Sequence, residues 1–187
     1  MDTFDAIATR RSVKWFDPDH RISPGETRKL LETTMLTPTA FNIQHWRFLV
    51  VDDPEQRKRL RPVCWNQAQI TDASLLVFFC ADTGAWQKQP ERYWHNAPKE
   101  VQEMAIPGIS NLFTGNVQLQ RDEAIRSGSL AGQTLMLAAT AMGYQTCPIT
   151  GYDQEKVAEI INLPLDHILV LWWSARELRS LGPILVN

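Results

Sequence analysis

The stretch Ser74-Leu75-Leu76-Val77-Phe78-Phe79-Cys80-Ala81 is a continuous apolar run with the length of one β-strand. A strand that faces water on one side alternates apolar and polar residues, and this run does not. We therefore predict a strand that is buried on both faces, at the centre of a sheet. Cys80 within it is expected to be an inert core thiol, because buried structural cysteines are unreactive.

Further helices and strands are predicted on both sides of this run. The other strands cover residues 46–51, 144–149 and 168–173, which are rich in aromatic and branched side chains. The predicted helices are a short one over residues 4–8, one that starts at the capping box Ser23-Pro24-Gly25-Glu26 and stops at Pro38, a polar one over 54–61, a long one over 121–142, and one after the N-cap Asp153.

The long helix, which Gly143 is expected to end, is the least ordinary of these elements. Its second half, residues 130–142, is apolar on nearly every side, which predicts burial all round. Small residues allow another backbone to approach it closely: Gly128, Ser129, Ala131 and Gly132. Such a helix is either a central core helix or part of a dimer interface, and we favour both roles together.

Composition excludes several classes of protein. A chain of 187 residues with 44% hydrophobic residues and a net charge of -2 fits one globular domain, and it lacks the basic excess of a nucleic-acid-binding protein. The acidic N-terminus has no signal-peptide pattern and no apolar run is long enough to span a membrane, so a cytoplasmic location is expected. Three cysteines without Cys-x-x-Cys spacing indicate neither a disulfide framework nor a zinc site. Asp17-Pro18-Asp19-His20 is interpreted as a turn rather than a metal site.

Two polar segments carry the candidate chemistry. Arg10-Arg11-Ser12-Val13-Lys14 gathers three cations and a hydroxyl, which suits an anionic ligand such as phosphate, although a solvated basic turn would have the same composition. The segment Pro38-Thr39-Ala40-Phe41-Asn42-Ile43-Gln44-His45-Trp46 supplies amide side chains between a helix stop and a strand.

Together these segments resemble the signature of the FMN-dependent nitroreductase family. That signature is an Arg-x-Ser-x-Lys/Arg segment, a helix, and then Pro-Ser-x-x-Asn-x-Gln-Pro-Trp; here Thr39 replaces Ser and His45 replaces the second Pro. The resemblance continues through Asn66, the apolar strand, the long helix and Cys147-Pro148-Ile149-Thr150-Gly151-Tyr152-Asp153, and it covers roughly residues 3–172. For His45, a structural or exposed position is favoured over contact with a ligand.

The resemblance implies a fold and an assembly. The fold class is α+β, with a central, mostly antiparallel sheet wrapped by helices, in a single FMN-binding domain over residues 1–187. A helical excursion at about 83–116 would cover the open face of the flavin, although a plain surface hairpin is the alternative. The assembly would be an intertwined homodimer. The tail at about 174–187, charged and then apolar, indicates from its own residues an arm that docks on another surface, such as that of the partner subunit.

The resemblance also implies roles for individual residues. Arg10 would hold the FMN phosphate, Ser12 and Asn66 would bond the ribityl chain and ring edge, Lys14 would stabilise the anionic reduced ring, and Arg11 would contribute backbone or charge. Further contacts would come from the other subunit through Pro38, Thr39, Ala40, Asn42 and Gln44, and from a ring-facing segment formed by Pro148, Ile149, Thr150 and Gly151. This chain departs from many relatives at Gln69 (usually Lys), at Thr150 (usually Glu) and at the C-terminal phosphate grip, for which Arg176 and Arg179 are the candidates.

The function implied is hydride transfer from NADH or NADPH through FMN to an electron-poor acceptor, such as a nitroaromatic or a quinone, by a ping-pong mechanism. No side-chain nucleophile and no metal are expected. Two alternatives stay open: a flavoenzyme with another redox reaction (dehydrogenation or reductive dehalogenation), and a non-catalytic flavin-binding protein.

Overall fold

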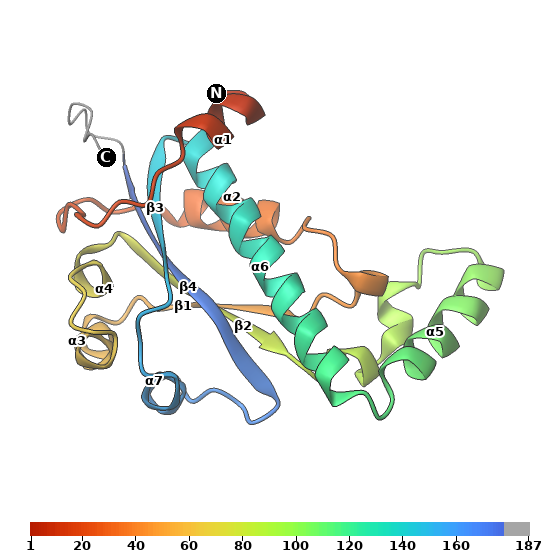
Figure 1. The fold of residues 1–187 in the computed structure, drawn as a ribbon. Coiled ribbons are helices and arrows are strands. Elements are labelled where there is room, and N and C mark those ends of the chain that lie inside the picture. The colour runs from red at the N-terminus through yellow and green to blue at the C-terminus, as the bar shows by residue number, and fades with distance from the viewer. Residues whose placement is uncertain (178–187) are drawn as a thin grey trace.

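The computed structural model describes residues 1–177, which form one antiparallel sheet with helices on both faces (Figure 1). The strands are β1 (Trp46–Val50), β2 (Leu75–Asp82), β3 (Tyr144–Ile149) and β4 (His167–Glu177). The α-helices are α1 (Thr3–Thr9), α2 (Pro24–Thr34), α3 (Pro54–Val63), α4 (Gln69–Asp72), α5 (Lys99–Phe113), α6 (Val117–Ala141) and α7 (Gln154–Ile160). Three 3-10 helices are η1 (Ala40–Asn42), η2 (Ala85–Gln87) and η3 (Pro90–Tyr93).

The sheet confirms the predicted α+β class. Its strand order is β1-β2-β4-β3, and each neighbouring pair is antiparallel. Phe48 of β1 lies opposite Phe79 of β2, and Cys147 of β3 lies opposite Ser174 of β4. Outside the strands, an isolated parallel bridge joins Ser12 to Thr146 and attaches the N-terminal segment to β3.

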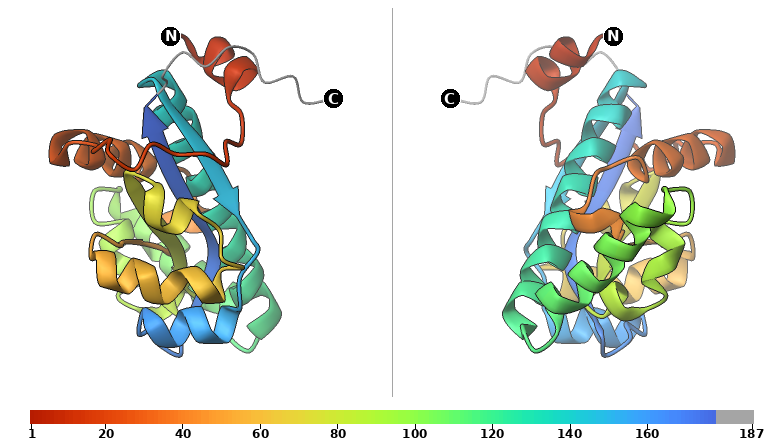
Figure 2. Two further views of the ribbon diagram at one scale, coloured as in Figure 1. Left: turned by 90° about the vertical axis from the view of Figure 1, so that its left-hand side faces the viewer. Right: turned by 90° about the vertical axis from the view of Figure 1, so that its right-hand side faces the viewer.

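Strand β2 is the centre of the core, as its apolar run predicts. All eight of its residues are buried. Leu75, Val77 and Phe79 belong to a cluster with α2 and α6, whereas Leu76 and Phe78 belong to a second cluster with α3 and α7. Figure 2 shows the same two layers, with α3 and α7 on one face of the sheet and α6 on the other.

The starts and ends of the other elements follow local rules. The capping box of α2 is present, since Glu26 N–H donates to Ser23 Oγ (3.2 Å) and Ser23 N–H donates to Glu26 Oε2 (3.1 Å). Gly143 follows α6 with φ +89°, as expected of a glycine that ends a helix. Asp17 bonds the amides of Asp19 (3.0 Å, through Oδ1) and His20 (3.3 Å, through its carbonyl), so the predicted turn is confirmed.

Three predictions need correction. Helix α6 begins at Val117 rather than at residue 121, because Asn116 Oδ1 accepts from Leu119 N–H (3.1 Å) and caps the helix earlier. Its second half is not buried all round within one chain: Leu130 is 50% exposed. The proposed C-terminal arm also starts too early, since residues 174–177 extend β4 along β3. The rest of that arm, residues 178–187, lies outside the described residues.

The excursion between β2 and α6 has a small core of its own. Its buried residues Ala85, Trp86, Ile109 and Phe113 pack with Ile43, which comes from the segment before β1. The rings of Trp86 and Phe113 are stacked, with centroids 5.9 Å apart. The excursion is therefore a packed part of the domain, and its predicted role as a cover over the flavin stays a prediction. Over the described residues, no helix is both long enough and apolar enough to cross a membrane.

A glycine sets how closely α6 approaches the sheet. The pairing of β2 with β4 shifts register between Phe79 and Cys80, which leaves Val170 as an extra residue on β4. A Cβ added to Gly128 of α6 would lie only 2.7 Å from Val170 Cγ2. Glycine at this position therefore lets the bulge of β4 sit against the helix.

We expect Gly128→Ala to destabilise the protein by about 1 kcal/mol. Alanine favours a helix over glycine by about 1 kcal/mol, but overpacking against a β-branched side chain costs about 1–3 kcal/mol. Urea unfolding of the variant measures the difference. The double variant Gly128→Ala/Val170→Ala should lose this clash. Its loss of stability should therefore be smaller than the sum of the losses of the two single variants. A single variant more stable than the parent would contradict this explanation of Gly128.

Candidate active site

The basic segment 10–14 runs along β3. Val13 N–H donates to the carbonyl of Thr146 (3.0 Å), next to the bridge between Ser12 and Thr146. Arg10 Nη1 lies 3.5 Å from Ser12 Oγ. The positive charges of Lys14 and Arg10 act on Cys147, where they oppose the rise in thiol pKa caused mainly by burial. Arg10, Ser12 and Lys14 thus form one basic group at this strand.

Arg11 does not join this group. Its Nη1 donates to the carbonyls of Ala8 (2.8 Å) and Arg10 (2.9 Å), where helix α1 ends. A guanidinium at that position satisfies helix carbonyls and interacts favourably with the helix dipole. The structure accounts for Arg11 as a helix cap.

An amide group lies beside the basic group. Asn66 Oδ1 accepts from Arg61 Nε (3.1 Å), and Gln67 Nε2 donates to the carbonyl of Gly151 (2.8 Å). Gln69 is buried and donates to Gln67 Oε1 (3.2 Å), and its hydrogen bond to the Cys147 thiol partly offsets the rise in the thiol pKa that burial causes. These contacts bring residues 66–69 to the end of β3, beside the predicted segment 148–151.

The end of β3 and the turn that follows it alternate between buried and accessible residues. Pro148 and Gly151 are partly buried, Ile149 is buried in the core and Thr150 is exposed. Asp153 N–H donates to the carbonyl of Val63 (2.8 Å), which ties this turn to the end of α3. Backbone and side chains of three chain segments therefore meet here; we call Arg10, Ser12, Lys14, Asn66, Gln69 and residues 148–151 the basic-amide site.

Trp65 is a site residue that sequence reasoning missed. Its indole packs against Gly151, because a Cβ added to this glycine would lie 2.7 Å from Trp65 Cε3. The side chain is nevertheless 76% exposed. An exposed tryptophan at the edge of a polar site is a ready aromatic surface for a planar ligand. The only signal in the sequence was its position directly before Asn66.

The second predicted motif, residues 38–44, lies elsewhere in the same chain. Gln44 N–H donates to Thr39 Oγ1 (3.0 Å), and Gln44 Nε2 donates to Asn42 Oδ1 (2.9 Å). Asn42 Nδ2 in turn donates to the carbonyl of Tyr93 (3.4 Å) in the excursion. Pro38 is exposed and Ala40 opens η1. Figures 1 and 2 show η1 on the α5 and α6 side of the sheet, whereas the basic-amide site borders the α3 and α7 side.

Backbone strain is concentrated in these motifs. Seven non-glycine residues in the described chain have positive φ, and five of them belong to the two motif regions. Those five are Phe41, Asn42, Gln44, Trp65 and Asn66. Left-handed backbone costs about 1–2 kcal/mol for an ordinary residue, and asparagine tolerates it best. Bulky residues such as Phe41 and Trp65 in this conformation are typical of functional sites that the rest of the fold holds in place.

His45 is structural in this chain, as favoured from the sequence. It is fully buried, its Nδ1 lies 3.0 Å from Ser127 Oγ, and its ring approaches that of Phe113 with a centroid distance of 6.3 Å. Burial lowers the pKa of this histidine to about 4, so the ring is neutral at pH 7. It joins the start of β1 to α6.

A charge cluster anchors the excursion to the sheet. Lys88 Nζ lies 2.8 Å from Asp82 Oδ2 and 2.6 Å from Asp166 Oδ2, and His167 Nδ1 lies 2.7 Å from Asp166 Oδ1. Hydrogen bonding by Lys88, followed by that of His167, lowers the pKa of Asp166 to about 2. Oxygen and nitrogen atoms of Asp82, Asp166 and His167 are close enough for a metal ion. Lys88 bridges both carboxylates and Arg47 also pairs with Asp82, so ion pairs within the protein explain the cluster.

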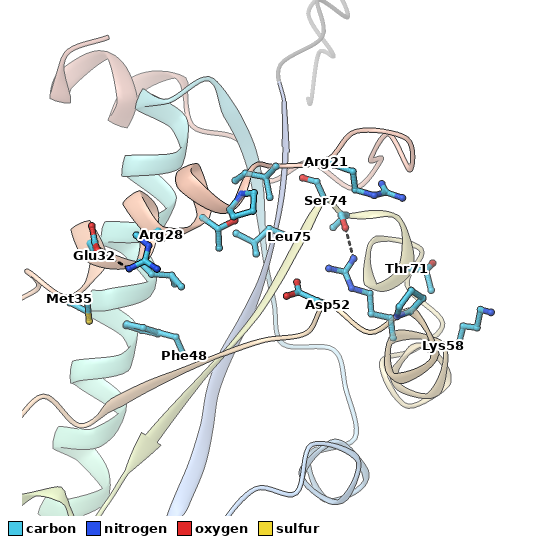
Figure 3. A pocket seen from close by; sticks show the side chains of 17 residues that line it. Arg21, Arg28, Glu32, Met35, Phe48, Asp52, Lys58, Thr71, Ser74 and Leu75 are labelled. Carbon is cyan, nitrogen blue, oxygen red and sulfur yellow. Dashed lines mark hydrogen bonds and ion pairs between the residues drawn. The ribbon is translucent and has the colours of Figure 1, made fainter.

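A groove on the α2 side of the sheet contains none of the predicted site residues. It has a volume of about 910 Å³ and lies between α2, β1 and α3, with Arg28 and Glu32 on one side, Lys58 on the opposite side and Asp52 between them (Figure 3). Arg57 at its base donates to the carbonyls of Val51 (2.7 Å) and Ala73. The donors of this buried guanidinium bond backbone carbonyls, so Arg57 has a structural role in the groove.

Two arginines near the C-terminus are predicted to grip the phosphate, and the structure describes the backbone of one of them. Arg176 lies on β4 opposite Gln145 of β3. Arg179 lies outside the described residues. Both remain predictions as phosphate ligands.

This fold and the basic-amide site define a class of protein. The chain belongs to the Nitroreductase family, whose profile matches residues 7–173. The predicted resemblance is therefore confirmed.

Individual relatives agree with this assignment. The chain is 56% identical to Protein DrgA of Synechocystis over 90% of its own length and 80% of the relative. It is 35% identical to YdgI of Bacillus subtilis, named as a candidate NAD(P)H nitroreductase, over 87% of the chain and 81% of the relative. A candidate nitroreductase of Exiguobacterium sibiricum, solved in complex with FMN, superposes with a TM-score of 0.90 at 30% identity, over 100% of this chain and 93% of that one.

Replacement of Trp65 tests the strain at the site. Both Trp65→Gly and Trp65→Ala remove the indole, but only glycine adopts φ +52° without a steric penalty. We therefore expect the glycine variant to be more stable than the alanine variant by about 1 kcal/mol in denaturant unfolding. Lys58 in helix α3 is the matched control, where alanine should be the more stable by about 1 kcal/mol. If alanine were the more stable replacement at position 65 as well as at position 58, this result would argue against strain at Trp65.

Proposed function

We propose that this protein is an FMN-dependent oxidoreductase that accepts hydride from NADH or NADPH and reduces an electron-poor acceptor, such as a nitroaromatic or a quinone. The observation that carries the proposal is the convergence of Arg10, Ser12, Lys14 and the 66–69 amides at the end of β3. The family assignment and the FMN-bound neighbour support it.

The donor set fits FMN. Arg10 and Ser12 offer charged and neutral donors to a phosphate, and Asn66 and Gln69 offer amides to the ribityl chain and the ring carbonyls. The atoms nearest to a Cβ added at Gly151 all belong to the Trp65 indole, so a flat group that takes the place of the indole lies against this glycine. When bound, FMN supplies reversible hydride chemistry.

The chain's own residues set the electrostatics of that chemistry. Lys14 is exposed at the site and places positive charge where a reduced ring would be negative. Gln69 is buried and neutral, and both Gln69 and Lys14 interact with Cys147. Because Gln69 carries no charge, the positive charge beside it comes from Lys14. We infer that reduction of the acceptor depends strongly on Lys14.

We further propose that the protein is a homodimer in which residues 38–44 of one chain complete the basic-amide site of the other. Within one chain the two motifs lie on different sides of the sheet. Large apolar side chains are exposed along α1, the end of α2 and α6, including Phe4 (83%), Leu36 (83%) and Leu130 (50%). Thr37 donates to Thr134 (2.9 Å), which brings the end of α2 to the part of α6 that carries Leu130. A surface of this kind is typical of an interface.

The alternatives differ in the chemistry of the bound flavin. The ping-pong mechanism predicts that donor and acceptor use the same place in turn. A flavoenzyme with another redox reaction would still be reduced by a suitable donor, whereas a non-catalytic flavin-binding protein would not react with NADH or NADPH. The neutral Gln69 and Thr150 in place of charged residues are the observations that favour this last alternative.

The purified protein should show the visible spectrum of bound FMN, which NADH or NADPH bleaches under anaerobic conditions. Lys14→Met and Arg10→Met should weaken FMN binding at least tenfold, because each removes a charge-assisted bond worth about 1.5–3 kcal/mol. Lys58→Met, which removes an exposed cation paired with Glu55, is the control and should bind FMN normally. A colourless protein that also fails to bind added FMN would refute the proposal.

Leu130→Glu should break the dimer and, with it, FMN binding. A buried unpaired carboxylate costs several kcal/mol, enough to shift a dimer to monomers at micromolar concentration. Leu165→Glu makes the same change at a fully exposed leucine between α7 and β4 and should leave the dimer intact. Analytical ultracentrifugation measures the assembly, and the flavin spectrum measures binding. A monomeric Leu130→Glu variant that keeps its FMN would show that one chain suffices for the site.

A further inference from the structure

A second, polar pocket borders the 38–44 motif. It has a volume of about 620 Å³ and lies between η1, the start of β1 and η3. Asn42 and Gln44 form one wall, and Arg92, Tyr93 and His95 form the other. Pockets for cofactors and substrates have volumes of about 300–1,000 Å³, so this one is large enough for part of a nucleotide.

The two arginines of this pocket differ in how they are neutralised. Arg47 Nη2 lies 3.3 Å from the buried carboxylate of Asp82, and its Nη1 donates to the carbonyls of Gln44 (3.0 Å) and Trp46 (2.8 Å). Arg92 instead stacks on the ring of Tyr93, with Cζ 4.6 Å from the centroid, and donates to the Tyr93 hydroxyl. Among residues 1–170, whose side chains the structure describes, no carboxylate forms an ion pair with Arg92. The free positive charge of the pocket therefore belongs to Arg92.

The backbone around Arg92 is held in place. His95 Nδ1 lies 2.7 Å from the carbonyl of Arg92, so this nitrogen carries the proton and donates. The left-handed Gln89 directs the chain into η3, and the ion pairs of Lys88 fix the start of this turn to the sheet. A guanidinium stacked on an aromatic ring and held at a pocket mouth is suited to bidentate recognition of phosphate.

We propose that Arg92 recognises a phosphate group of the reduced nicotinamide dinucleotide and thereby discriminates phosphate-bearing hydride donors from neutral ones. This inference depends on the proposed function, because Asn42 and Gln44 belong both to the pocket and to the motif proposed to complete the flavin site. The pocket therefore opens beside the place where a dihydronicotinamide must bind. The phosphate has two possible sources: the 2′-phosphate, found only in NADPH, and the pyrophosphate, shared by NADH and NADPH.

The test compares three donors in anaerobic stopped-flow reduction of the holoenzyme: NADPH, NADH and the phosphate-free 1-benzyl-1,4-dihydronicotinamide. The readout is the ratio of second-order rate constants between each dinucleotide and the benzyl donor. Arg92→Gln should lower this ratio about tenfold or more, which corresponds to about 1.4 kcal/mol or more, and Arg92→Lys should restore part of it. Arg28→Gln removes an exposed arginine paired with Glu32 on α2 and should leave the ratio unchanged.

The outcomes separate the possible explanations. A fall for NADPH alone assigns the 2′-phosphate, and an equal fall for both dinucleotides assigns the pyrophosphate. An unchanged ratio in Arg92→Gln overturns the inference, as does an equal loss with all three donors, which would indicate a structural role. If none of the donors reduces the bound flavin of the parent protein, the proposed function fails and this inference fails with it; normal reduction with an unchanged ratio refutes the inference alone.

Discussion

The burial of β2 on both faces is the constraint on which the rest of the structure depends. Side chains of one strand alternate between faces, so Leu75, Val77 and Phe79 require cover from α2 and α6 while Leu76 and Phe78 require cover from α3 and α7. Because both faces of the sheet are covered, the polar residues of a binding site must lie at the edges of the sheet. The basic-amide site occupies the end of the edge strand β3, and the 38–44 motif immediately precedes the opposite edge strand, β1.

The margins are also where the backbone departs from its preferred conformations. Phe41, Asn42, Gln44, Trp65 and Asn66 all have positive φ. At about 1 kcal/mol or more each, their combined strain is comparable to a large part of the roughly 5–15 kcal/mol net stability of a typical domain. The core of β2 must offset this strain. Rigid strain of this kind keeps polar groups oriented before a ligand arrives, which reduces the ordering cost of binding.

Local rules made much of the fold predictable, but not the contacts between distant segments. The unbroken apolar run of β2, the capping box at Ser23 and the glycine after α6 each carry their own physical signal, and the structure has all three. Burial around α6 was overestimated, because apolar composition does not say which side faces a partner rather than the core. Arg10 and Lys14 could be connected to residues 66–69 only through the family resemblance, since no periodicity relates them. The contact of Trp65 with Gly151 had no sequence signal beyond adjacency to Asn66.

The separation of the two motifs has a thermodynamic consequence for the proposed assembly. A ligand that contacts both the basic-amide site of one chain and residues 38–44 of another binds the dimer and not the monomer. Binding at each of the two equivalent sites then stabilises the dimer by RT ln(1 + [L]/Kd), about 2.7 kcal/mol per site when the ligand concentration is a hundred times Kd. The exposed Leu36 and Leu130 need not make the association strong on their own, because cofactor and interface stabilise the same state. Phosphate-binding cations, strained amides and an apolar surface on α6 are then parts of a single folding and binding equilibrium.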